Sequence, residues 1–172
     1  DATNFNSEIS GWDVSNGTNF SSMFQGASSF NQAIDNWDVS NGTNFSGMFW
    51  GASSFNQDLN NWDVGNGKYF FSMFRDALSF NQNIGIWDVG SAISFSNMFN
   101  GASDFNVSIG SWDTSSAKYF NNMFKNASLF NQDISDWDVS KGRSFDYMLS
   151  GASSSDKNIS YWSVDSSATL AN

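Results

Sequence analysis

The residues best placed to do chemistry are six aspartates that recur every 25 residues. Each directly follows a tryptophan: Asp13, Asp38, Asp63, Asp88, Asp113 and Asp138. A row of carboxylates suits Ca²⁺, but Ca²⁺ takes about six to eight oxygen ligands and one Asp per repeat supplies few of them. In the structural alternative, each carboxylate accepts a hydrogen bond from the backbone two residues further on. We expect the structural role and keep the metal row as the alternative.

Catalytic residue types are scarce. The chain contains no Cys and no His, which excludes Cys–His and Ser–His catalysis and a Cys/His metal site. Glycoside hydrolysis uses a pair of carboxylates with different roles, whereas the Asp row is uniform and has no distinguished pair. We therefore predict that the protein is not an enzyme, has no catalytic residues and needs no cofactor, calcium being the one alternative.

The charge balance narrows the choice of partners. The chain carries 17 acidic and 7 basic residues, a net charge of −10, which argues against nucleic acid and anionic membrane surfaces as partners. No apolar run is long enough to span a membrane, so no membrane insertion is predicted. The first 67 residues hold seven acidic and no basic residues. Such a charge gradient along a rod favours head-to-tail approach of two copies.

The elements that position these residues follow a strict period. Tryptophan recurs at a constant step of 25, and Phe, Asn, Met and Ala keep the same step in columns of their own; the Trp positions are Trp12, Trp37, Trp62, Trp87, Trp112, Trp137 and Trp162. A fixed period in this range is typical of stacked repeats. We predict a single solenoid domain over residues 1–172 with about seven 25-residue repeats, in which the Asn column forms a ladder along the stack.

Within one repeat the spacing of apolar residues changes. Ile34, Trp37 and Val39 are spaced as in a short strand with one buried face, and residues 40–42 read as a turn. The next apolar residues fall at i, i+3, i+4 and i+7, the pattern of one helix face; they are Phe45, Met48, Phe49 and Ala52. Because Gly51 lies inside that frame, we expect the helical segment to end near it.

The repeat unit resembles that of the BspA-like bacterial surface proteins, which are leucine-rich-repeat relatives. Its sequence reads W-D-V-S-N-G-T-N-F-S-x-M-F-x-G-A-S-S-F-N-Q-x-I, and the resemblance covers essentially the whole chain. It implies a leucine-rich-repeat-like solenoid, with one short parallel strand plus one short helical segment per 25-residue turn. It also implies an extracellular or cell-surface location and a role in adhesion or surface structure. Gly17, Gly42 and Gly67 stand where the family often has Val, so we expect a less packed turn there.

The two ends of the predicted stack suggest self-association. The first turn has a full set of core residues, including Phe5, Ile9 and Trp12, and the last turn keeps Ile159, Trp162 and Leu170 in register. An open end of a solenoid exposes core side chains and unpaired backbone. We predict an extracellular structural or adhesive solenoid, with assembly head-to-tail into a fibre. The competing account is that the chain is a fragment of a longer solenoid.

A binding module is the alternative function, with the strand face recognising a glycan or a cell-surface or host protein. Several aromatic and basic residues depart from the repeat and form a candidate partner patch: Trp50, Tyr69, Phe71, Arg75 and Tyr119. Asn16 and Asn41 lie in Asn-x-Thr sequons in the turn and are the candidate glycosylation sites.

Overall fold

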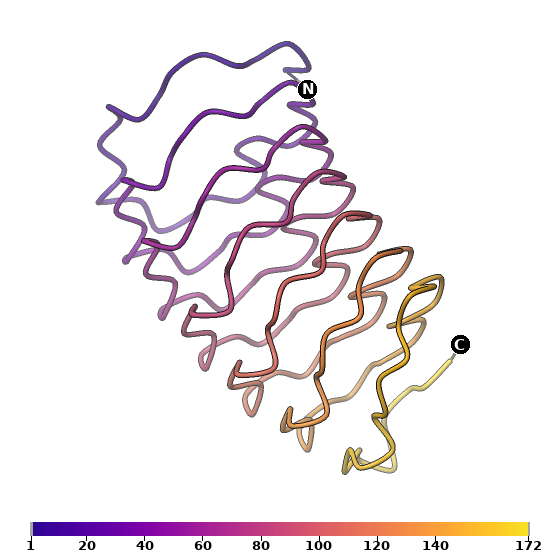
Figure 1. The fold of residues 1–172 in the computed structure, drawn as a ribbon. Coiled ribbons are helices and arrows are strands. Elements are labelled where there is room, and N and C mark those ends of the chain that lie inside the picture. The colour runs from indigo at the N-terminus through magenta and orange to yellow at the C-terminus, as the bar shows by residue number, and fades with distance from the viewer. Residues whose placement is uncertain (1, 172) are drawn as a thin grey trace.

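The chain winds into successive turns that lie side by side along one axis (Figure 1). This computed structural model describes residues 2–171, so Asp1 and Asn172, which mark the ends of the expected head-to-tail contact, lie outside the described residues. Neighbouring turns are joined by backbone hydrogen bonds between residues 25 positions apart. The N–H of Thr43 donates to the carbonyl of Thr18 at 2.9 Å, and that of Lys68 donates to the carbonyl of Thr43 at 2.9 Å.

The predicted fold class, a leucine-rich-repeat-like solenoid with a strand and a helical segment in every turn, is wrong. Residues 2–171 contain no helix and no strand of more than one residue. Regular pairing in this part of the chain is confined to isolated parallel bridges in one column: Asn19 with Asn44, Asn44 with Tyr69, Tyr69 with Ser94, Ser94 with Tyr119, Tyr119 with Ser144, and Ser144 with Thr169. The same residues include no helical segment with the length and apolarity to cross a bilayer.

Left-handed residues replace the predicted helix by a series of tight turns. Gly47 and Gly51 have φ of 62° and 73°, and the same two columns are left-handed along the stack, including Ser72, Asn97 and Asn122. A left-handed residue every four positions interrupts the α-helical backbone. The N–H groups therefore alternate between two kinds of acceptor. That of Met48, for example, bonds locally to Phe45, whereas that of Phe49 crosses to Met73 in the next turn.

The apolar columns still face one interior. A spacing of three or four residues also places side chains on the same side of successive tight backbone turns within one repeat. Phenylalanine rings of neighbouring turns stack along the axis, as Phe49 does on Phe74 with ring centroids 5.4 Å apart. Within a turn the rings pack closer, and the Phe74–Phe80 centroids are 3.9 Å apart. Trp87 is buried, and its indole N–H donates to the carbonyl of Leu59 at 3.1 Å. The aromatic columns therefore both fill the core and fix the register between turns.

The expectation of a loosely packed turn at Gly17, Gly42 and Gly67 is also wrong. A Cβ added at Gly17 would lie 2.6 Å from Cζ of Phe20 and 2.9 Å from the carbonyl oxygen of Val14. Glycine is needed here because a phenylalanine ring from the following segment lies directly against the backbone. The absence of a valine side chain is thus compensated by the ring that covers the turn.

Candidate functional site

The Asp column lies on the outside of the stack and caps the turn that follows it. Asp38 Oδ1 accepts from the backbone N–H of Ser40 at 3.1 Å and from its hydroxyl at 2.6 Å. Where glycine follows, the backbone bond alone remains, as from Gly90 to Asp88 at 3.0 Å. The hydroxyl and backbone of Ser40 lower the pKa of Asp38, and the Asp13 charge opposes this only weakly. The predicted bond to the backbone two residues on is confirmed.

The Asp row does not gather into a cation site. Among residues 2–171 no group of three or more acidic side chains has the arrangement that would hold a metal ion. One carboxylate oxygen of each of these residues already accepts a hydrogen bond from the backbone two residues further on, as at Asp63 from Gly65 and at Asp113 from Ser115. These hydrogen bonds therefore support a structural role for the Asp column.

The Asn column is structural, as predicted. The side-chain oxygen of Asn56 accepts from the backbone N–H of Asn81 at 3.0 Å and from the Gln82 amide at 2.9 Å. The same pair of bonds links Asn31 to the turn of Asn56. Each side-chain oxygen thus ties one turn to the next.

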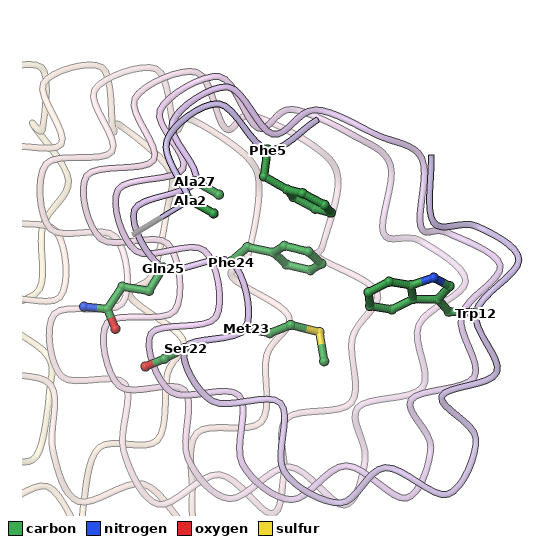
Figure 2. Close-up of a pocket in the computed structure, with 8 residues that line it drawn as sticks. All are labelled: Ala2, Phe5, Trp12, Ser22, Met23, Phe24, Gln25 and Ala27. Atoms are coloured by element: carbon green, nitrogen blue, oxygen red, sulfur yellow. The ribbon is translucent and has the colours of Figure 1, made fainter. Parts of the chain in front are cut away.

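One end of the stack presents an apolar hollow of about 490 Å³ (Figure 2). Phe5, Trp12, Met23 and Phe24 line it, and Trp12 is 54% exposed. Trp12 nevertheless stacks on Trp37 of the second turn, with ring centroids 6.2 Å apart. Ile9 was predicted as an end residue, but it is buried and does not line the hollow. The accessible part of this face is therefore formed by Phe5, Trp12 and Met23.

The opposite end has a matching apolar hollow of about 290 Å³. Ile159, Trp162 and Leu170, all predicted as end residues, line it together with Phe145 and Met148. Trp162 stacks on Trp137 with a centroid distance of 6.3 Å, which repeats the Trp12–Trp37 geometry. The two hollows thus share three columns of side chains, with Trp12 and Trp162, Met23 and Met148, and Phe24 and Leu149 as counterparts, whereas the column of Phe5 holds Ser155 at this end.

The candidate partner patch is only partly assembled. The guanidinium of Arg75 lies 4.7 Å from the centre of the Trp50 ring, and the Trp50 indole N–H donates to Asp76 at 3.3 Å. Tyr69, Phe71 and Tyr119 are each about two-fifths exposed. Tyr119 stands in the same column as Tyr69 but two turns away, with Ser94 between them. The structure therefore joins Trp50 to Arg75 and leaves Tyr119 apart.

The two sequon asparagines are both exposed, but they differ in their contacts. The amide of Asn41 donates to the carbonyl oxygen of Ser15 at 2.8 Å and helps to hold two turns together. Asn66 makes the same bond to Ser40 at 2.9 Å. A glycan attaches at the amide nitrogen, which in Asn41 already makes this inter-turn bond and in Asn16 makes none among the described residues, so Asn16 is the better candidate acceptor.

A basic pocket near the last turns escaped the sequence analysis. Lys118, Lys141 and Arg143 line a pocket of about 430 Å³, and the rest of its wall comes from Ser140, Gly142, Asp165 and Ser167. The signal was present in two columns of the repeat. The column of Lys141 holds Asn in the first three turns, and the column of Arg143 holds Thr in the first two. Basic residues in place of the Asn and Thr of these two columns would have marked the site.

Stacked 25-residue turns with one set of side-chain columns define a repeat protein. The chain belongs to the family described as "Mycoplasma protein of unknown function, DUF285". The family model matches residues 1–108 and residues 70–172, so the two overlapping matches together cover the whole chain. Overlapping matches of one model are typical of a repeated sequence. Comparison with curated proteins found no similar sequence.

Proposed function

We propose that this protein is an extracellular structural or adhesive repeat protein of the BspA-like type, whose stacked turns assemble head-to-tail at a cell surface. The family match and the repeat motif support the repeat character, and the motif's resemblance to bacterial surface proteins supports the location. The partner in this proposal is a second copy of the chain. The array of stacked turns supports the adhesive role, because stacked repeats offer an extended surface to which another molecule can bind.

The observation that carries the proposal is the match between the two end faces. Inside the stack, Trp62 lies on Trp87 with a centroid distance of 6.4 Å, and every turn covers the core residues of the turn before it. At the ends, Trp12 and Trp162 have a partner on one side only. A second copy placed head-to-tail would set Trp12 against Trp162 and cover both hollows with the contacts found between internal turns.

Sedimentation velocity over a wide range of protein concentration tests this assembly. The wild-type chain should shift from monomer to larger species as concentration rises. Trp12→Lys should move that shift to at least about tenfold higher concentration, because a charge would enter an apolar contact.

Ile86→Lys is the matched control, because Ile86 is 67% exposed on the side of the stack rather than at an end. It should leave the association unchanged. A wild-type chain that stays monomeric at high concentration, or equal effects of the two lysines, would overturn the proposed assembly.

A further inference from the structure

The basic pocket gathers three cations on neighbouring turns of an acidic protein. Lys118 lies in one turn, and Lys141 and Arg143 lie in the next. Stacked turns are separated by about 4.8 Å when their backbones hydrogen-bond as neighbouring strands do. The whole chain has only seven basic residues and a net charge of −10, so nearly half of its positive charge borders one pocket.

These cations replace residues that hold the stack together elsewhere. In the second turn, the Asn41 amide donates to Ser15 and the Thr43 hydroxyl donates to Thr18 at 3.1 Å. Lys141 and Arg143 occupy the same two columns in the sixth turn, where no side-chain bond to the preceding turn takes the place of either. Ser91 and Ile93 occupy these columns in the fourth turn and also make no such side-chain bond, so the two bonds are dispensable and the positively charged wall is what sets the sixth turn apart.

The pocket cations form no close ion pair among the described residues, although Arg143 lies near enough to lower the pKa of Asp165 after the hydrogen bonds from Ser167. In the part of the chain that the structure describes, the ion pairs join Arg75 to Asp76 and Lys157 to Asp156. Asp165 lines the pocket, but its Oδ1 already accepts from the backbone and hydroxyl of Ser167, at 2.7 and 2.6 Å. Lys141 and Arg143 are exposed and Lys118 is half-buried. Their charged groups are therefore available to an anion from outside.

We propose that this pocket binds the sulfate or carboxylate groups of an acidic polysaccharide, with Lys118, Lys141 and Arg143 as the anion-binding residues. A ligand that carries spaced charges along a chain fits cations that lie on successive turns, and the guanidinium offers two parallel donors to an oxyanion. The hydroxyl of Ser140 and the carboxylate of Asp165 border the same space and suit sugar hydroxyl groups as hydrogen-bonding partners.

A nucleic acid fits this surface less well. Duplex DNA carries one charge per about 1.7 Å, and its affinity depends on many phosphate contacts. Asp138 and Asp165 border the basic residues, and Lys141 lies close enough to lower the pKa of Asp138 after the hydrogen bonds from Ser140. A dense polyanion would meet these carboxylates. The inference does not depend on head-to-tail assembly, because the pocket lies on the side of the stack.

Isothermal titration with dextran sulfate at low salt tests the proposal, since screening weakens exposed charge contacts. A triple variant should bind dextran sulfate at least about tenfold more weakly than the wild type. Each of its substitutions installs the residue that the second turn has in the same column, so the fold should persist: Lys118→Thr, Lys141→Asn and Arg143→Thr.

A second triple variant removes the same charge outside the pocket and serves as the control. Its substitutions also take residues found in the same columns of other turns: Lys68→Thr, Lys125→Asn and Lys157→Gln. It should keep nearly wild-type affinity. Equal weakening by both triples, or no binding of dextran sulfate by the wild type, would overturn the site.

Three further titrants separate the sources of the anion. Neutral dextran should not bind, and inorganic sulfate at the same sulfate concentration should bind far more weakly than dextran sulfate. Equal binding of inorganic sulfate would overturn the polymeric ligand. Equal or tighter binding of single-stranded DNA would overturn the choice of a polysaccharide.

Discussion

Substitution of Gly47 by alanine distinguishes the tight turns from the helix that the apolar spacing predicted. Gly47 has a φ of 62°, and a Cβ added there meets nothing closer than the Ser22 hydroxyl at 3.4 Å. Space is therefore adequate, and the effect comes from the backbone alone. A left-handed conformation costs an L-residue about 1–2 kcal/mol. Alanine also lowers the conformational entropy of the unfolded chain, which stabilises the folded state by about 0.4–1 kcal/mol and offsets part of this cost.

We expect Gly47→Ala to lower the free energy of unfolding by about 1 kcal/mol. In a helix the same change would raise it by about 0.8–1 kcal/mol, so the two structures predict opposite signs. Ser72 occupies the same column one turn later, with φ 54°, and its buried hydroxyl has no hydrogen-bond partner among the described residues. Ser72→Gly should therefore stabilise the protein by about 1 kcal/mol.

Urea unfolding followed by tryptophan fluorescence measures both effects, with Gly11→Ala as the control. Gly11 has open space around its Cβ position and an ordinary φ, so its substitution should change stability little. A 1 kcal/mol effect corresponds to about 2–4 °C in the melting temperature of a chain this long. A stabilising Gly47→Ala together with a destabilising Ser72→Gly would refute the left-handed turns.

Three other predictions concern the core, the repeat and the Asp row. Trp87→Ala should cost about 3–5 kcal/mol, and Trp87→Phe should cost about 0.5–1.5 kcal/mol because the carbonyl of Leu59 loses one of its two donors and keeps the backbone N–H of Trp62; urea unfolding measures both, and equal stability of all three chains would contradict the packing. Deletion of residues 76–100 should leave a cooperatively folded protein by circular dichroism, since the neighbouring turns present the same columns; an unfolded product would argue against equivalent turns. Serine hydroxyls and backbone lower the pKa of Asp13 and Asp38, so their stabilisation is complete above the unfolded pKa of about 3.9 and is lost as pH falls through the lower folded value. The melting temperature should therefore fall below about pH 4 and stay constant from about pH 6 to 8, because the chain has no His to titrate there. A higher melting temperature in acid would contradict the capping role.

The period and the interior columns could be predicted from the sequence. Trp37 and Val39 are buried on either side of exposed Asp38, as the alternation indicated. The Asp bond to the turn also followed from the residue types, because Asp commonly caps the backbone two positions on. These features depend on local chemistry that repeats in every turn.

The helical segment was mispredicted because two different backbones bury residues at nearly the same spacing. Phe45 and Phe49 are four residues apart, which suits both an α-helix and two successive tight turns. The distinguishing signal lies in the columns of Gly47 and Gly51, which hold Gly, Ser, Asn or Asp in most turns. Residues of these types tolerate a left-handed φ, so their recurrence every four positions favours turns.

The candidate sites were predicted less completely than the core. Ile9 carries the core spacing, but the sequence could not show that the first turn covers it while leaving Trp12 exposed. The period already places Lys118 and Arg143 on adjacent turns, but it does not show that Lys141, Asp165 and Ser167 border the same pocket. Contacts of this kind depend on which positions of each turn form the edge of the stack, and composition alone does not contain that information.

Disulfide trapping between the two ends tests head-to-tail assembly most directly, because the chain has no cysteine of its own. Gly11 and Tyr161 stand in the same column at opposite ends of the stack, and Tyr161 is 82% exposed. In a continued stack these two residues of neighbouring copies would lie about one turn spacing apart, within the Cα separation that a disulfide spans. Ile86→Cys with Ser111→Cys in one chain is the positive control, since it places the pair on adjacent internal turns.

A mixture of the Gly11→Cys and Tyr161→Cys chains should give a cross-linked heterodimer on oxidation, whereas each chain alone should give far less dimer. A chain that carries both substitutions should give a ladder of longer polymers. Efficient closure of the internal control pair, without any heterodimer above the level of the separate chains, would contradict the proposed assembly.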